Sequence, residues 1–244
     1  MRWGGKETWD NIIAYLHEEQ PDILMLQEVY NSIEPNVPTY LSAFTSLKKE
    51  LDYTYSEYES QFNMKHGEDY GPLGLALFSK FPLLEKSVLW LQGNGMREVD
   101  HDDAGGAPTQ PRNLLHCKTK INGIIYNLMT LHGIWAPNGN ETEPQKEMAK
   151  KIFSYIADKE NIILSGDFNV NENTSCINLL EAKLKNIFKG ERTTSFNIAR
   201  KKNPVFANAI VDFIFVSPNI EVTEHRTSDK DVSDHQSQIV VINT

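Results

Sequence analysis

The sequence predicts an α/β protein in which two mixed β-sheets pack face to face and helices cover the outside. Apolar runs of strand length alternate with amphipathic segments of helical length along the whole chain. Asn122-Gly123 separates two strand-like runs and is a strong hairpin signal, so antiparallel pairs are mixed with helix crossovers. The expected strands are too many for one sheet of modest width, and two packed sheets follow.

Length and composition favour one soluble domain spanning residues 1–244. The chain is 40% hydrophobic, enough for one substantial core, and no shift in composition divides it. Its apolar runs are far shorter than the ~18 residues that a membrane span needs. Cys117 and Cys176 are far apart without metal-ligand spacing, which indicates buried or half-buried thiols. A cytoplasmic location fits these thiols and the absence of an apolar leader segment at the N-terminus.

The charge balance limits the partners. The chain has 33 acidic and 24 basic residues and a formal net charge of −9, which argues against a broad basic face for a phosphate backbone. A phosphoester substrate remains compatible, because a bound divalent cation reverses the local field and its carboxylate ligands add to the acidic count.

The first half of the chain is expected to contain two helices and three strands. Thr8 is a candidate N-cap, and Pro21 ends the segment that follows it. The expected elements are a helix over 9–19, a strand over 23–26 buried on both faces, a helical segment from Tyr40 to Leu51, and strands over 53–56 and 75–79.

The second half begins with a stretch from Gln92 to Pro111 that is rich in Gly, Pro and Asp. We expect a long loop that borders the active-site mouth. The elements expected after it are hairpin strands over 114–121 and 124–131, a helix with Met148 and Ile152 on its inner face, a strand over 162–164, a helix over 177–184, and strands over 211–216 and 238–242.

Carboxylates follow directly on these strands. Glu28 ends an apolar run, where a carboxylate is costly unless a cation meets it, and Mg²⁺ or Mn²⁺ prefers oxygen ligands. A helix cap or a lysine pair would also explain Glu28. Asp167 and Asn169 lie two apart after Gly166, so they point to the same side. They could activate a water and bind a phosphoryl oxygen, or form an Asx turn.

Two histidines also lie at strand ends. His235 follows Asp234, and Asp212 is the candidate second carboxylate that holds its tautomer. His132 ends the strand over 124–131 and would face the same crevice, although a lone histidine there is more often structural. Arg112 could clamp a phosphate, but an exposed surface arginine is the simpler interpretation.

Together these motifs resemble the endonuclease/exonuclease/phosphatase superfamily. The resemblance extends over nearly the whole chain, in the order and spacing of the family. It is carried by Leu26-Gln27-Glu28-Val29, the run from Gly74 to Leu83, Leu131-His132, Gly166-Asp167-Phe168-Asn169, the run from Asp212 to Ser217, and Ser233-Asp234-His235.

The resemblance implies a four-layer α/β sandwich like that of deoxyribonuclease I, with two packed, mostly antiparallel or mixed β-sheets flanked by helices. It also implies Mg²⁺-dependent, or Mn²⁺-dependent, hydrolysis of a phosphate ester. Glu28 matches the metal-binding glutamate, and Asp234 would lie near the metal.

The resemblance assigns the catalytic roles in the same way. Asp167 would orient or activate the attacking water, and Asn169 would bind the phosphoryl oxygen. His235 would contact the phosphate with Asp212 as its partner, and His132 would contact the phosphate or the leaving group.

The start of the chain departs from the family pattern. Members usually begin with a buried strand that ends in an asparagine, and Arg2-Trp3-Gly4-Gly5 matches the segment after it. We therefore expect the domain to lack this first strand, which would leave a slot in the sheet with exposed backbone edges.

The leading hypothesis is a monomeric phosphodiesterase, nuclease-like or acting on small-molecule or lipid phosphoesters. Its partner is then a phosphoester substrate, with nucleic acid among the candidates. The alternative is a non-catalytic phosphate-binding or scaffold member that has lost a metal ligand.

Overall fold

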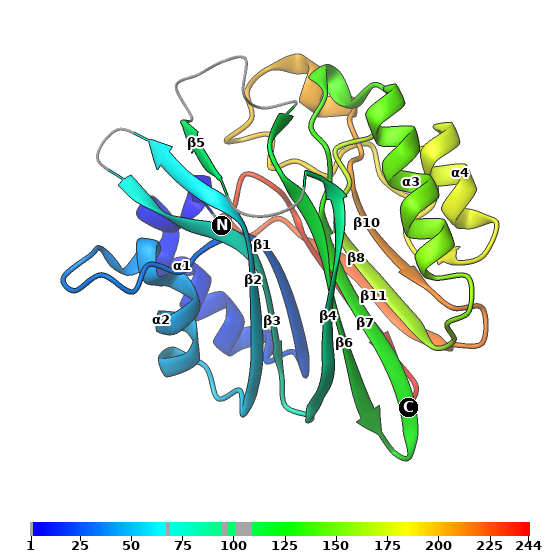
Figure 1. The fold of residues 1–244 in the computed structure, drawn as a ribbon, viewed down its shortest axis with the longest axis horizontal. Coiled ribbons are helices and arrows are strands. Elements are labelled where there is room, and N and C mark those ends of the chain that lie inside the picture. Colours follow the sequence, from blue (N-terminus) through cyan, green and yellow to red (C-terminus); the bar gives the residue numbers. More distant parts are fainter. Residues whose placement is uncertain (1, 67–68, 94–96, 101–108) are drawn as a thin grey trace.

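The computed structural model describes residues 2–66, 69–93, 97–100 and 109–244. Two β-sheets pack against each other, with helices outside (Figure 1). One sheet has four strands in the order β1-β3-β2-β5, and the other has six in the order β4-β6-β7-β8-β10-β9. A separate pair, β11-β12, completes the β-structure of these residues. This is the predicted four-layer α/β sandwich, and the fold prediction is confirmed.

The element bounds are as follows. The strands are β1 (Ile23–Tyr30), β2 (Tyr55–His66), β3 (Asp69–Ser79), β4 (Leu83–Gln92), β5 (Glu98–Asp100), β6 (Arg112–Ile121), β7 (Ile124–His132), β8 (Ile162–Asp167), β9 (Lys185–Asn186), β10 (Asp212–Val216), β11 (Val222–Ser228) and β12 (Ser237–Ile242). The helices are α1 (Arg2–Glu19), η1 (Thr39–Ser42), α2 (Ala43–Glu50), η3 (Pro137–Gly139), α3 (Glu143–Tyr155), α4 (Ser175–Glu181) and η4 (Pro204–Asn208). No helix of the described residues is both long and apolar enough to cross a membrane.

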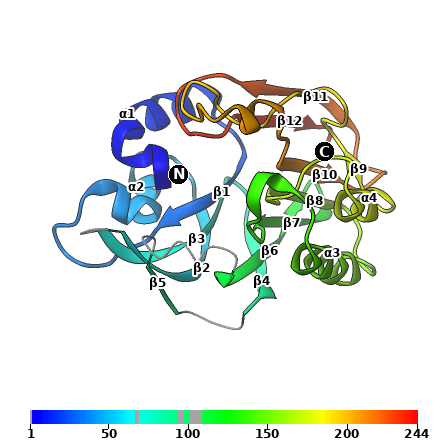
Figure 2. The same cartoon turned by 90° about the horizontal axis from the view of Figure 1, so that it is seen from above.

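Alternation of side chains along the strands creates three apolar layers. Leu75 and Leu77 of β3 face the six-stranded sheet, whereas Ala76 and Phe78 face α1 and α2. Phe213 of β10 belongs to the apolar layer between the six-stranded sheet and the helices α3 and α4. The layer between the sheets also includes side chains from β11 and β12, so this pair lies on the same side of the six-stranded sheet as β1 (Figure 2).

Most predicted elements are present. The Asn122-Gly123 hairpin is confirmed, with positive φ at both residues as a tight two-residue hairpin turn requires. The first helix begins earlier than expected, at Arg2, but its backbone kinks at Thr8, where we placed the cap. The free thiols of Cys117 and Cys176 are buried, as expected.

The interpretation of 92–111 as one long loop is wrong in part. Residues 98–100 form β5, which extends the four-stranded sheet by pairing with β2 in parallel. Residues 94–96 and 101–108 lie outside the described part of the chain. Strands over 83–92 and 222–228 were not expected, because their alternation is interrupted by charged residues on an exposed face.

The expectation that 23–26 would be buried on both faces is also wrong. Each of these residues is only half-buried, although all four are apolar. In the described part of the chain β1 pairs with β3 alone, and β12 pairs with β11 alone. Each therefore leaves one backbone edge without a neighbouring strand.

Candidate active site

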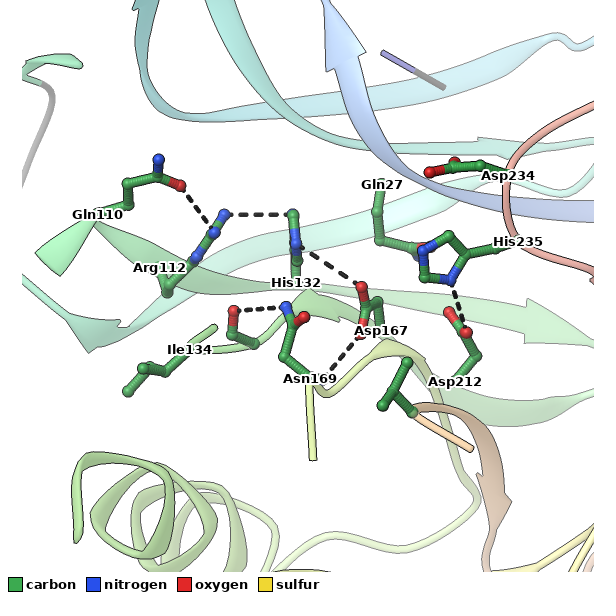
Figure 3. A network of polar contacts seen from close by, with 12 residues as sticks. Gln27, Gln110, Arg112, His132, Ile134, Asp167, Asn169, Asp212, Asp234 and His235 are labelled. Carbon is green, nitrogen blue, oxygen red and sulfur yellow. Dashed lines mark hydrogen bonds and ion pairs between the residues drawn. The ribbon is translucent and has the colours of Figure 1, made fainter. Parts of the chain in front are cut away.

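Strand register brings three of the predicted residues together. His132 at the end of β7 is paired with Asp167 at the end of β8, and Asp167 is paired with Asp212 at the start of β10. Residues paired across strands point to the same face. All three side chains therefore face the four-stranded sheet, and Figure 3 shows them converging with His235.

The backbone is strained at two of the predicted site residues. Glu28 has φ of 55° and lies at an irregularity in the pairing of β1 with β3. Asn169 also has φ of 55°. Non-glycine residues adopt this region at a cost, and such positions are concentrated at functional sites.

Gly166 lets the chain approach β7 closely before it reaches Asp167. Its φ is 150°, and a Cβ atom at this position would lie 2.1 Å from the carbonyl oxygen of Leu131. No other amino acid fits without moving the backbone. Gly166 thus helps to define where the Asp167 carboxylate lies.

Asp167 and Asn169 form the Asx turn that was the alternative interpretation, and they also line the site. The backbone N–H of Asn169 donates to Oδ1 of Asp167 at 2.7 Å, and Nδ2 of Asn169 donates to the carbonyl of Gly133 at 3.1 Å (Figure 3). Oδ2 of Asp167 is left facing the crevice, 3.8 Å from Nε2 of His132. The turn therefore orients the carboxylate rather than excluding a catalytic role.

Gln145 stabilises this turn through buried hydrogen bonds, and the sequence did not lead us to expect it. Its side chain is fully buried, and Nε2 donates to the carbonyls of Ile134 and Asn169 at 2.9 and 2.7 Å. Its Oε1 accepts from the backbone of Thr142, which caps α3. The capping-box pattern was the only signal in the sequence that could have identified it.

His235 and Asp212 form the predicted pair. Nδ1 of His235 lies 2.8 Å from Oδ2 of Asp212, and the His235 ring lies 4.4 Å from the ring of Phe196 between centroids. Burial alone lowers the pKa of His235, but the carboxylates of Asp212, Asp167 and Asp234 outweigh it and raise the pKa to about 10. The surrounding carboxylates therefore favour the protonated, cationic form of the imidazole.

The carboxylates around His235 repel one another. Burial, followed by the charges of Asp212 and Glu28, raises the pKa of Asp167 to about 7, although His235 and the backbone bond from Asn169 act in the opposite direction. Glu28 acts in the same direction on the pKa of Asp234. Glu28 is thus near enough to affect both aspartates electrostatically.

His132 is held by a buried arginine. Nη1 of Arg112 lies 3.2 Å from Nδ1 of His132, and Nη2 donates to Oε1 of Gln110 at 2.8 Å (Figure 3). A guanidinium only donates, so Nδ1 of His132 accepts and Nε2 has the proton that faces Asp167. The interpretation of Arg112 as an exposed surface residue is wrong, because Arg112 is 3% exposed.

Asp234 has a basic partner that the sequence did not indicate. Nζ of Lys201 lies 2.8 Å from Oδ2 of Asp234, and Lys201 also lies over the ring of Phe206. Burial alone raises the pKa of Asp234, but His235 and Lys201 outweigh it and hold this pKa below its ordinary value. The loop that contains Lys201 is apart from Asp234 in sequence, so only the fold reveals the pair.

The donor set fits a divalent cation. Asp167, Asp212 and His235 present ligand atoms within 4.8 Å of one another. The neighbouring carboxylates favour the protonated form of His235, however, and an imidazolium has no lone pair for a metal. The oxygens of Glu28 and Asp234, next to two further carboxylates, are the hard ligands that Mg²⁺ or Mn²⁺ prefers, and a cation there would relieve their repulsion.

The family follows from a match over most of the chain. A model of the Endonuclease/Exonuclease/phosphatase family matches residues 7–235. The chain belongs to this family, whose members are hydrolases of phosphate esters and generally depend on divalent metals. No curated protein sequence matches the chain.

Solved structures of the family share the fold at low identity. An endonuclease/exonuclease/phosphatase from Bacteroides vulgatus is 19% identical with a TM-score of 0.69, and the match covers 98% of this chain and 91% of that one. A mannosyl-6-phosphatase from Bacteroides thetaiotaomicron is 19% identical with a TM-score of 0.66 over the same shares. D. rerio TDP2 in complex with a single-strand DNA product is 19% identical with a TM-score of 0.69, over 96% of this chain and 91% of that one.

Proposed function

We propose that the protein is a divalent-metal-dependent phosphoesterase in which a water attacks phosphorus in line. The observation that carries this proposal is the cross-strand alignment of His132, Asp167 and Asp212 beside the His235 imidazolium. It supports the proposal because a carboxylate that could take a proton then lies close to side chains that could bind phosphoryl oxygens.

The proposed roles follow from which atoms remain available. Oδ1 of Asp167 is occupied by the Asx turn, so Oδ2 orients the water and receives its proton. Nδ1 of His235 donates to Asp212, and its other ring nitrogen donates to a non-bridging oxygen. Asn169 offers the second hydrogen of its Nδ2 to the same phosphoryl group, and Nε2–H of His132 faces the phosphate or the leaving oxygen.

Glu28 and Asp234 are the residues proposed to hold the cation. A Mg²⁺ or Mn²⁺ ion bound there would supply charge stabilisation for the phosphoryl oxygens. Glu28 is positioned for this by the irregularity in β1, and Asp234 by the backbone bond from Asn197 N–H to its carbonyl, at 2.9 Å. Lys201 shares Asp234, so it would have to move or share that carboxylate with the ion.

The test is a panel of phosphomonoesters and phosphodiesters, including a mannose phosphate, single-stranded DNA and a phospholipid, with Mg²⁺, Mn²⁺ or EDTA. The proposal predicts turnover of at least one substrate that EDTA abolishes and added metal restores. Turnover that persists in EDTA would overturn the metal dependence.

A non-catalytic phosphate-binding protein is the second candidate, and Lys201 favours it. Its ammonium neutralises Asp234, and with His235 it provides two cations for a phosphate without any metal. Phosphate affinity measured by calorimetry separates the candidates. The phosphate-binding candidate predicts binding that EDTA does not change, together with no turnover anywhere in the panel.

The net charge of the chain bears on the proposed substrate. A net charge of −9 favours a small phosphoester or a few nucleotides over a long polyanion that wraps the protein. We propose that the protein acts as a monomer, which light scattering can check.

A further inference from the structure

Trp135 is an exposed aromatic residue in a segment that is otherwise buried beside the candidate active site. It lies three residues after His132. Trp135 is 40% exposed, whereas Ile134 and Ala136 on either side of it are 3% and 6% exposed. Ile134 packs in the apolar layer under α3. The indole of Trp135 therefore faces solvent and is not part of that layer.

The segment that carries Trp135 is bonded directly to the turn at Asp167 and Asn169. The N–H of Gly133 donates to the carbonyl of Asp167 at 2.6 Å, and Nδ2 of Asn169 donates to the carbonyl of Gly133 at 3.1 Å (Figure 3). A Cβ atom on Gly133 would lie 2.3 Å from the carbonyl oxygen of Phe168. The two backbones are therefore in contact, and the position of Trp135 is linked to that of the proposed catalytic turn.

The chain is bonded to the same turn again beyond Trp135. The backbone N–H of Asn171 donates to the carbonyl of Gly139 at 2.9 Å, and its Nδ2 donates to the carbonyl of Asn138 at 3.0 Å. The backbone is thus held both before and after Trp135. A side chain on such a backbone loses little further freedom when it contacts a ligand, so an exposed indole there is suited to binding.

We infer that Trp135 stacks on a planar aromatic ring carried by the phosphoester, and so determines the class of substrate. The inference rests on the proposed function. The Cα atoms of His132 and Trp135 are at most about 11 Å apart, because three peptide units separate them. One small ester could therefore place its phosphate near His132 and its ring on the indole.

The charge of the chain supports a contribution from stacking. A formal net charge of −9 gives little general attraction for a phosphate. Stacking on an aromatic side chain needs no charge, and it accepts any flat ring. Two kinds of phosphoester have such a ring: a nucleotide, where a sugar separates the ring from the phosphate, and an aryl ester, where the ring is bonded to the ester oxygen.

The test compares the affinities of two pairs of phosphates in the presence of Mg²⁺. Uridine monophosphate is paired with ribose 5-phosphate, and phenyl phosphate with ethyl phosphate, so that each pair differs by one aromatic ring. All proteins carry Asp167→Asn, which prevents hydrolysis of the ligands during calorimetry. In at least one pair the ligand with the ring should bind roughly tenfold more tightly, and that pair identifies the source of the ring.

Trp135→Ala should abolish this preference and leave the affinity of the ligand without the ring unchanged. Trp135→Phe should keep part of the preference, because a smaller ring remains. The ligand with the ring should also quench tryptophan fluorescence, and this quenching should be absent from Trp135→Ala. Ile125→Ala is the matched control, since Ile125 is 47% exposed at the opposite end of β7 from His132, and it should change neither affinity.

The other outcomes overturn the inference in distinguishable ways. Equal affinities within both pairs would show that no ring is bound, while the phosphate site of the proposed function would stand. Equal weakening of both members of a pair by Trp135→Ala would show that Trp135 supports the phosphate site and does not stack. If none of the four phosphates binds, the proposed function is wrong and the inference is wrong with it.

Discussion

Nδ1 of His235 lies 2.8 Å from Oδ2 of Asp212, although the two residues are 23 positions apart in the sequence. The pair joins the start of β10 to the residue before β12, next to a carboxylate from β8. This crevice thus contains His235, whose pKa is raised by its acidic neighbours, and Asp167, whose pKa is raised by burial and by the charge of Asp212. This combination is what a site for an anionic substrate requires.

Asp212→Asn should remove the main charge that keeps His235 protonated. Burial would then count for more, and the pKa of His235 should fall well below its present value of about 10. Turnover should fall by roughly 10²-fold or more, because the imidazolium is no longer oriented or stabilised. Titration of the His235 ring by NMR, alongside kinetics, measures both. An unchanged titration would contradict the pairing.

His235→Ala and Asp167→Asn should each reduce turnover by ~10²–10⁴-fold. The double variant should be little worse than the poorer single variant, since both groups act on one transition state. Thermal melts provide the control. Near-native melting with lost activity supports the catalytic roles, whereas retained activity in a folded variant would remove that residue from the mechanism.

Arg112→Met should free Nδ1 of His132 from its donor and leave Gln110 without its partner. We expect a loss of ~1–3 kcal/mol in the free energy of unfolding and a mixture of His132 tautomers. Nitrogen chemical shifts of the His132 ring report the tautomer directly. A ring that keeps its proton on Nε2 alone would show that Arg112 does not hold it.

Lys201→Met should tighten Mn²⁺ binding by roughly tenfold, because the ammonium beside Asp234 both neutralises that carboxylate and repels a cation. Lys202→Met is the matched control, since it removes the same charge from an exposed neighbour. Calorimetry on the three proteins measures the effect. If both variants bind Mn²⁺ equally more tightly, the effect comes from the net charge of the protein and not from the position of Lys201 beside Asp234.

His116 should make the fold sensitive to acid independently of the active site. Its ring is buried between Tyr155 and Asn127, and this burial lowers its pKa below the ordinary value. The unfolded chain therefore takes up the proton first as the pH falls through about 6.5, and stability is lost below that pH. The measurement is the midpoint of urea unfolding as a function of pH. In His116→Gln this midpoint should fall less steeply below about pH 6.5. An unchanged slope would show that groups other than His116 cause the loss of stability.

The strands with regular alternation could be predicted from the sequence because their local pattern and their burial agree. The hairpin at Asn122-Gly123 is the best case, since its two turn residues need the positive φ that Asn and Gly tolerate. β4 could not be predicted in the same way. Glu85 and Lys86 are exposed in succession at an irregularity in its pairing with β6, and they obscure the alternation.

The same distinction applies to the site. Asp167, Asp212 and His235 were predictable because each lies where an apolar run begins or ends. Arg112 and Lys201 were not, because their importance depends on partners that only the tertiary fold brings near. A buried arginine cannot be distinguished from an exposed one by its neighbours in sequence.

The most direct test of the central claim is Mn²⁺-dependent phosphodiester hydrolysis by the wild type and by Glu28→Gln, each titrated with metal from an EDTA-stripped state. The account predicts saturable turnover for the wild type, and for Glu28→Gln weaker Mn²⁺ binding with a matching shift of the activation curve. Turnover that is already present in EDTA, or an identical activation curve for Glu28→Gln, would contradict it.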